Sequence, residues 1–277
     1  MDDVRALLNK PEFPRSSTYD ADWMLDHQMG PSAVWLVEWL CERLALAPGM
    51  RVLDLGCGKA MTSVFLAREF GVQVHAVDLW MSPDHNLRRA REAGVDHLVC
   101  PIKGEAHALP FARGYFDAVV SIDAYQYFGT DDLYLDYLAS FVRPGGSLGV
   151  VTVGLTCPLE GGVPPPHLTE PQSNGKVFWE DSCRCFKTPD FWRSLWNGCP
   201  LVSGVEVDLL ADGCRHWADF ERAIERSGKG FFPSDAEALE RDADTTLAFV
   251  RMVARRTDAD TENFYDASLG ARLGIDR

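Results

Sequence analysis

Long apolar runs are missing from this sequence of 277 residues: none reaches the roughly 20 residues that a membrane-spanning helix needs. The first residues also lack the basic stretch and apolar core of a secretory signal. We therefore expect a cytoplasmic protein with no membrane partner. Basic residues are scarce as well, 27 against 41 acidic ones, for a net charge of −14. A nucleic-acid-binding surface needs basic patches, so we expect no nucleic-acid partner and favour a neutral or cationic small molecule.

Closely spaced cysteine pairs are also rare. The eight cysteines are spread along the chain without a C-x-x-C pair, at positions 41, 57, 100, 157, 183, 185, 199 and 214. Such spacing does not indicate a disulfide framework. The only close pair, Cys183 and Cys185, has no histidine at metal-ligand spacing. Two ordinary thiols are the simpler interpretation and a metal site the alternative, so we expect no metal ion.

What is present is a composition typical of a folded domain, with 46% hydrophobic and 25% charged residues. Between residues 47 and 155, short apolar strands alternate with helical stretches, which predicts a parallel sheet covered by helices on both faces. Ligands of such sheets bind at the carboxyl ends of the strands. The predicted strands cover residues 51–55, 73–78, 99–102, 118–122 and 147–153.

The first predicted strand runs into Asp54-Leu55-Gly56-Cys57-Gly58, a glycine loop that indicates a nucleotide-type cofactor site. Gly56 and Gly58 lack a Cβ, so the backbone can adopt positive φ and let a ligand approach closely. The helix predicted over residues 62–70 directs its positive N-terminus at the same place. A pyrophosphate-binding loop would carry a third glycine where this chain has Met61, so a dinucleotide is disfavoured.

This loop resembles the first motif, D/E-x-G-x-G, of the class I S-adenosylmethionine-dependent methyltransferases. The resemblance implies S-adenosylmethionine as cofactor and S-adenosyl-L-homocysteine as its product, with the loop against the amino-acid half of the cofactor. The implied contacts there are Asp54, Gly56, Cys57 and Gly58. One such motif is only moderately specific, but four further blocks follow it in the family's order, as far as residue 153.

The second block, residues 71–78, is an apolar strand that ends in Asp78. A carboxylate at that position can accept hydrogen bonds from both ribose hydroxyls, and we assign Asp78 this role. The alternative is that Asp78 caps the helix that follows, because Asp is a good N-cap residue. Leu79 and Trp80, just beyond it, would offer an apolar surface to the adenine edge.

Two further blocks extend the resemblance toward the reacting group. Residues 102–111 match the segment that holds adenine, which implies contacts from Glu105 and Ala106; the family commonly has Asp where this chain has Glu105. Residues 115–128 match the block nearest the transferred methyl group, and Ser121 in its strand is placed among the cofactor contacts.

The last block, residues 141–153, carries the helix end, Pro-Gly-Gly turn and strand that commonly complete this sheet. Two more predicted strands, over residues 203–210 and 247–255, would add the antiparallel end typical of the family. The resemblance therefore implies an α/β fold with a doubly wound, seven-stranded, mostly parallel sheet. This is the Rossmann-like methyltransferase fold, here with N-terminal helices and a helical cap insertion.

Methyl transfer from a sulfonium is an in-line displacement, so positioning matters more than a strong acid or base. Asp123 is our candidate catalytic residue, because it follows the fourth strand and should face the cleft, where a carboxylate could take a proton from the acceptor. The alternative is that Asp123 hydrogen-bonds the next turn. Tyr125, Tyr127 and Phe128 are assigned to the acceptor pocket, with packing beneath the cap as the alternative.

The N-terminal segment is expected to lie over the cofactor cleft, with Tyr19 and His27 in the acceptor pocket; ordinary core and surface positions are the alternative for both. The rest of the chain divides by composition and pattern. The predicted units are a helical lid (1–46), the methyltransferase domain (47–257) with a substrate loop and helix (154–200) and a helical cap (211–246), and a polar tail (258–277).

We expect a methyltransferase that acts on a small organic acceptor at an oxygen, nitrogen or carbon atom. A nicotinamide-dependent oxidoreductase is the first alternative, disfavoured by the missing third glycine. A non-catalytic S-adenosylmethionine-binding module is the second. The C-terminal half is rich in tryptophan, which would suit an acceptor pocket and counts weakly against that module. The sequence gives no indication of the oligomeric state.

Overall fold

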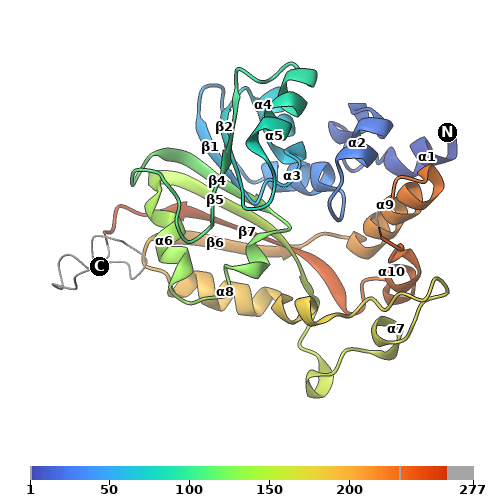
Figure 1. The fold of residues 1–277 in the computed structure, drawn as a ribbon. Coiled ribbons are helices and arrows are strands. Elements are labelled where there is room, and N and C mark those ends of the chain that lie inside the picture. Colours follow the sequence, from blue (N-terminus) through green and yellow to red (C-terminus); the bar gives the residue numbers. More distant parts are fainter. Residues whose placement is uncertain (1, 231, 261–277) are drawn as a thin grey trace.

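The computed structural model describes residues 2–230 and 232–260, so the predicted polar tail lies outside the described residues from residue 261 onward. Its seven-stranded sheet has the order β3-β2-β1-β4-β5-β7-β6. Strands β1 to β5 are parallel, and β7 pairs antiparallel with β5 and β6, which confirms the predicted sheet (Figure 1). The strands are β1 (Arg51–Leu55), β2 (Gln73–Asp78), β3 (Val99–Lys103), β4 (Phe116–Ile122), β5 (Val142–Leu155), β6 (Val202–Leu209) and β7 (Leu247–Arg256).

Strands β1 and β2 begin and end at the predicted residues, because each is a short apolar run that stops at a loop or an acidic residue. Strand β5 begins earlier than predicted. Val142 already pairs with Phe116, and the register then shifts so that Ser147 pairs with Ala118. The Pro-Gly-Gly turn thus forms an irregularity within β5 instead of preceding it.

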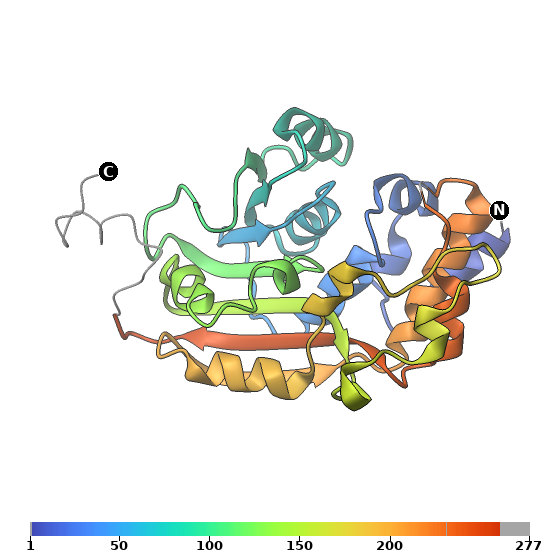
Figure 2. The same ribbon diagram turned by 60° about the horizontal axis from the view of Figure 1, so that its bottom comes forward.

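Helices cover both faces of the sheet (Figure 2). The first face carries α3, α4 and α5, whose buried residues join one hydrophobic cluster with the inward side chains of the strands. The opposite face carries α6 and α8 in a second cluster. The helices are α3 (Ala33–Cys41), α4 (Met61–Phe70), α5 (Pro83–Glu92), α6 (Tyr134–Ser140) and α8 (Pro189–Gly198).

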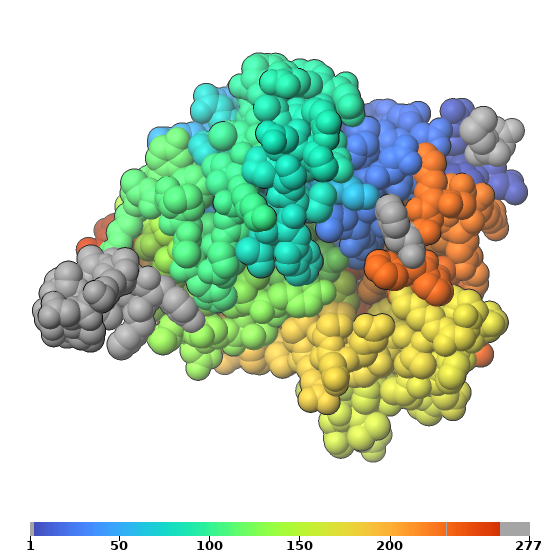
Figure 3. Space-filling model, viewed as in Figure 1, coloured from blue at the N-terminus to red at the C-terminus, as the bar shows by residue number. Residues whose placement is uncertain are grey.

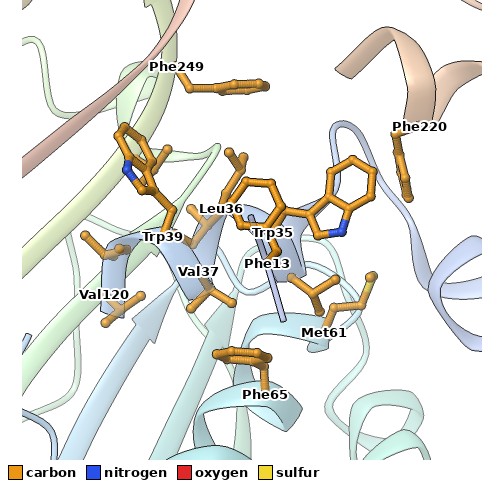
Figure 4. Close-up of a cluster of buried hydrophobic side chains, with 14 of the residues drawn as sticks. Phe13, Trp35, Leu36, Val37, Trp39, Met61, Phe65, Val120, Phe220 and Phe249 are labelled. Atoms are coloured by element: carbon orange, nitrogen blue, oxygen red, sulfur yellow. The ribbon is translucent and has the colours of Figure 1, made fainter. Parts of the chain in front are cut away.

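Helix α3 is the centre of the first cluster. Every residue from Val34 to Cys41 is buried, and the one charged residue among them, Glu38, accepts the N–H groups of Arg15 and Ser16 at 2.9 and 2.7 Å. The Trp35 ring stacks on Phe13 at 5.8 Å between centroids and meets the edge of Phe220 at 5.5 Å. Figure 4 shows these rings on one side of α3, with Phe65 of α4 on another. This helix therefore joins the sheet, the N-terminal segment and the cap in one core.

The N-terminal helices and the cap lie side by side on the surface (Figure 3). Helix α1 packs against α9, and Lys229 after α9 donates to the carboxylates of Asp22 and Asp26 at 2.9 and 2.8 Å. Both carboxylates belong to α2, so the cap holds the segment that precedes α3. The helices are α1 (Asp2–Leu8), α2 (Ala21–His27), α9 (Gly213–Ser227) and α10 (Ala236–Asp242).

The Pro- and Gly-rich stretch after β5 is a loop that contains short helical turns. It is tied to the cap by His167, whose ring lies 2.8 Å from the buried carboxylate of Asp242. Asp242 also accepts the backbone N–H of Leu247 at 2.9 Å, so one carboxylate joins the loop, α10 and β7. The turns are η3 (Glu160–Gly162), α7 (Pro166–Thr169) and η4 (Asp181–Cys185).

Candidate cofactor and acceptor site

A cavity of about 500 Å³ lies at the carboxyl ends of β1, β2 and β4. Strands β1 and β4 are the neighbours at which the strand order reverses, the place where open α/β sheets bind ligands. The loop after β3 and the segment between α2 and α3 complete its walls. The predicted site residues that line it are His27, Gly56, Cys57, Gly58, Asp78, Leu79, Trp80, Glu105, Ala106, Asp123, Tyr127 and Phe128.

The glycine loop is held tightly between β2 and β4. Gly56 has a φ of +76°, and a Cβ on it would lie 2.3 Å from the Cβ of Ala124, so only glycine fits. The N–H groups of Gly56 and Cys57 both donate to the carbonyl of Val77, at 2.8 and 3.1 Å. Burial raises the pKa of the Cys57 thiol well above its usual range, so this cysteine is a small packed residue and not a nucleophile.

Asp54 and Ser121 lie beneath this loop and do not line the cavity. Asp54 is fully buried, and one of its carboxylate oxygens accepts from the hydroxyls of Thr62 and Ser63 at 2.5 and 2.6 Å. Burial raises the pKa of Asp54 to about 6, against the opposing effect of these hydroxyls. Ser121 donates to the carbonyl of Leu55 at 2.7 Å. Both side chains fix the loop and the start of α4 from below.

Asp78 ends β2 and is 8% exposed. One of its oxygens accepts the N–H groups of Trp80 and Met81 at 2.8 and 2.9 Å, and the other accepts the N–H of Gly58 at 2.9 Å. A carboxylate has about four acceptor positions, so capacity is left for a ligand. Asp78 organises the turn after β2, but the N-cap of α5 is Ser82.

Apolar and acidic side chains share the wall near β2 and β3. Leu79 and Trp80 are 50% and 76% exposed and place two large apolar side chains side by side in the chain at this wall. Glu105 lies 2.7 Å from the imidazole Nδ1 of His107. Burial alone would raise the pKa of Glu105, but its hydrogen bonds with His107 lower it below the usual value. Glu105, which stands where the family commonly has Asp, is thus hydrogen-bonded to His107 at the cavity wall.

Asp123 lies at the end of β4 with a left-handed backbone, φ +51°. Its N–H donates to the carbonyl of Val151 at 2.8 Å, and its Oδ1 accepts from the amide nitrogen of Gln126 at 2.9 Å. Burial raises the pKa of Asp123 to about 7, while the bond from Gln126 lowers it. Asp123 therefore both lines the cavity and hydrogen-bonds the turn that follows.

Two tyrosines assigned to the acceptor pocket lie elsewhere. Tyr19 is buried against α4, and its hydroxyl donates to Glu69 at 3.1 Å. Tyr125 is fully buried and packs against Trp192 and Trp196 of α8, with centroid distances of 5.6 and 6.1 Å. Neither tyrosine lines the cavity. The tryptophans of α8 are likewise core residues and do not form an acceptor pocket.

Several lining and supporting residues were not predicted from the sequence. Met29, Gly30 and Pro31, between α2 and α3, line the cavity opposite the glycine loop. Asn86 of α5 donates from its amide to the carbonyl of Gly58 at 2.9 Å and so holds the loop in place. Only the Gly-Pro pair carries a local signal, a turn before a helix. The others depend on which segments meet in three dimensions.

Over residues 2–230 and 232–260, no three His, Cys, Asp or Glu side chains group as ligands for a metal ion. Across the same stretch, no helix has the length and apolar character to cross a bilayer.

Known methyltransferases are similar to this chain in sequence and in structure. A family model described as a methyltransferase domain matches residues 52–146. A sarcosine/dimethylglycine N-methyltransferase of Halorhodospira halochloris is 30% identical over 198 residues, which are 71% of this chain and 67% of that protein. Methyltransferase GfsG of Streptomyces halstedii is 30% identical over 119 residues, 43% of each chain. A solved geranyl diphosphate methyltransferase in complex with SAM has a TM-score of 0.59 at 22% identity, covering 80% of this chain and 84% of that one.

The structural likeness supports the fold alone. The aligned part is less than half the length of GfsG, but it covers two thirds of the N-methyltransferase at 30% identity. The motif order and the family match agree with that relationship. The chain belongs to the class I S-adenosylmethionine-dependent methyltransferases.

Proposed function

We propose that this protein binds S-adenosylmethionine in the cavity described above and transfers its methyl group to a small organic acceptor. One observation carries the proposal. A single cavity is lined by the glycine loop, the carboxylate of Asp78, the Glu105 loop and the carboxylate of Asp123. These groups follow the carboxyl ends of four strands, β1 to β4, so motifs that are separate in the sequence line one cavity.

The residues present fit the cofactor. The glycine loop provides a backbone cradle that a Cβ at Gly56 would disrupt, and Asp78 retains acceptor capacity for ribose hydroxyls. Leu79 and Trp80 offer exposed apolar surface for adenine, with Glu105 nearby. A volume of about 500 Å³ lies within the range of small-molecule sites. When bound, the cofactor supplies an electrophilic methyl group on a positively charged sulfur.

The part of the cavity near β4 is suited to the acceptor. Tyr127 and Phe128 line it from the turn after β4, and Gly30 of the N-terminal segment lies against Oδ2 of Asp123. Such walls orient an organic molecule and exclude water, which favours in-line displacement. Asp123 faces this space, and a pKa near 7 lets it accept a proton from an acceptor hydroxyl or ammonium at neutral pH.

We further propose that the acceptor carries no strongly anionic group. Among the described residues, Lys59 is the only lysine or arginine that lines the cavity, and its ammonium donates to the carbonyl of Asp26 at 3.1 Å. The residues that line the cavity at the turn after β4, Asp123, Tyr127 and Phe128, include no cation, so a carboxylate or phosphate placed there would lie against Asp123. A neutral or cationic acceptor avoids that repulsion.

The lid, substrate loop and cap boundaries remain part of this proposal. The contacts of Lys229 with α2 support a lid formed jointly by the N-terminal helices and the cap. A cytoplasmic location and the absence of a nucleic-acid partner stay predictions from composition.

The test is methyl transfer itself. Purified protein is incubated with S-adenosylmethionine and a panel of phenols, alcohols and amines. Each member is compared with an analogue that has the same carbon skeleton and an added carboxylate, and S-adenosylhomocysteine is quantified. We expect turnover of a neutral or amine member, reduced at least about tenfold in Asp123→Asn for loss of a general base. Cofactor binding without turnover of any member of a broad panel would favour the non-catalytic module.

A further inference from the structure

The conformation of Asp123 is unusual. A left-handed φ of +51° is uncommon for a residue with a side chain, and it is maintained only where the surroundings impose it. Here the N–H of Asp123 is fixed on Val151 of β5, so the residue cannot relax along the strand. Its Oδ2 lies close to the N-terminal segment: a Cβ on Gly30 would be 3.0 Å away. The carboxyl group is thus held with Oδ2 against the wall that faces the acceptor.

The other oxygen, Oδ1, is held by Gln126. This side chain is 1% exposed, and its amide nitrogen donates to Oδ1 at 2.9 Å. Its own carbonyl oxygen is buried without a hydrogen-bond partner among the described residues. A buried amide with one unsatisfied group destabilises the fold relative to an apolar side chain of the same shape. Stability therefore does not explain a glutamine at this position, whereas the bond to Asp123 does.

The turn that carries Gln126 is itself anchored. Tyr125 precedes it in the same short helix, η2 (Tyr125–Tyr127), and packs in the core against α8. The N–H of Gly129 donates to the carbonyl of Tyr125 at 2.6 Å and closes the turn. The position of the Gln126 amide is therefore set by core packing and not by solvent.

No charged side chain competes for Asp123. Among the described residues no lysine, arginine or histidine forms an ion pair with it, and its one hydrogen-bond donor to the carboxylate is Gln126. The charge of Asp123 raises the pKa of two nearby titratable groups, Tyr127 in the same turn and Cys185 in η4. Burial raises the pKa of Tyr127 to about 12 and that of Cys185 to about 11, so both are neutral at pH 7.

We propose that Gln126 is a positioning residue that donates to Oδ1 of Asp123, fixes the rotamer of the carboxyl group and leaves Oδ2 free to take the acceptor's proton. The role in proton transfer rests on the function proposed above, but the hydrogen bond and its effect on Asp123 do not. An amide N–H stabilises the ionised carboxylate more than the neutral acid. Gln126 thereby keeps Asp123 available as a base near neutral pH, in a place where burial alone would keep it protonated.

The test is the titration of Asp123 in the full chain, without cofactor or acceptor. Aspartate carboxyl carbons are labelled with ¹³C, and the Asp123 resonance is assigned by its loss in Asp123→Asn. In Gln126→Met, which keeps the length of the side chain, we expect the midpoint of Asp123 to rise by roughly 1–2 pH units. Should this variant fail to fold, Gln126→Glu, which keeps the shape and places a second carboxyl group beside Asp123, is expected to raise the midpoint as well.

Gln172→Met is the matched control. Gln172 is also buried and also donates to an aspartate, Asp235, at 3.3 Å, but neither residue lines the cavity. It should leave the Asp123 midpoint unchanged. A midpoint that stays the same or falls in both Gln126 variants would overturn the positioning role. Once an acceptor is found, the acid limb of kcat/KM against pH should move upward with the midpoint in Gln126→Met. If the midpoint moves and the acid limb does not, the positioning role holds and Asp123 is not the base.

Discussion

Replacement of Asp78 by Asn tests the contribution of this carboxylate to cofactor binding. The wild-type side chain accepts three backbone N–H groups, from Gly58, Trp80 and Met81, and uses both oxygens to do so. An asparagine of the same size has only one oxygen, so in either orientation its NH₂ group faces a backbone N–H. The variant therefore loses the charge toward the ribose and also loosens either the glycine loop or the turn after β2.

The size of the effect follows from these contacts. Hydrogen bonds to a charged group contribute about 1.5–3 kcal/mol. Loss of the ribose contact alone should then raise the Kd for S-adenosylhomocysteine by roughly 10- to 150-fold. Isothermal titration calorimetry measures this directly, with the product chosen because it cannot turn over.

Asp117→Asn is the control for a general loss of stability. Asp117 also accepts a backbone N–H, from Arg51 at 2.7 Å, but at the start of β4, away from the cavity. We expect this variant to bind S-adenosylhomocysteine with wild-type affinity. Equal affinity in wild type and Asp78→Asn, with both proteins folded by circular dichroism, would refute the ribose assignment.

Three further predictions test the geometry around the cavity. Since burial raises the pKa of Asp123 to about 7, the unfolding free energy of the wild type should fall relative to that of Asp123→Asn as the pH rises from about 4 to 7. The expected fall is about 2 kcal/mol after allowance for partial exposure. Urea unfolding at pH 4.5 and 8 measures it, and the same pH dependence in both proteins would contradict it. Gly56→Ala should lower the unfolding free energy by about 1–3 kcal/mol, because the new Cβ would lie 2.3 Å from that of Ala124. It should also weaken S-adenosylhomocysteine binding in calorimetry, and wild-type affinity would show that the loop can shift without loss of the binding site. Tyr125→Ala should lose about 3–5 kcal/mol as a core truncation, and Tyr127→Ala, 59% exposed, only about 0.5 kcal/mol; similar losses in urea unfolding would mean that the turn after β4 is misplaced.

The sheet was predictable because its strands are short apolar runs with clear ends. Leu55 and Asp78 end β1 and β2 in the structure as predicted, and parallel strands bring such ends to one edge. The glycine loop was equally clear, since Gly56 and Gly58 both adopt positive φ. These features are local, and local patterns report them.

The side-chain directions around the site were not predictable in the same way. Tyr125 and Tyr127 lie two residues apart in one short helix, yet one is fully buried and the other is 59% exposed, because the packing of α8 decides which side faces the core. Asn86 reaches the glycine loop only because α5 lies beside it. Met29 reaches Gly58 across the cavity, where a Cβ on the glycine would meet its sulfur at 3.0 Å. Such contacts follow from tertiary structure and have no signature in the spacing of residues.

The most direct test of the account is calorimetric titration of the full chain with S-adenosylmethionine, S-adenosylhomocysteine and NAD in separate experiments. We predict saturable binding of both adenosyl-sulfur compounds at one site, and a matching rise in the thermal midpoint by mass action. NAD should show no heat of binding, since this loop has Met61 where a pyrophosphate-binding loop carries its third glycine. Binding of NAD without binding of either adenosyl-sulfur compound would contradict the cofactor assignment and with it the proposed reaction.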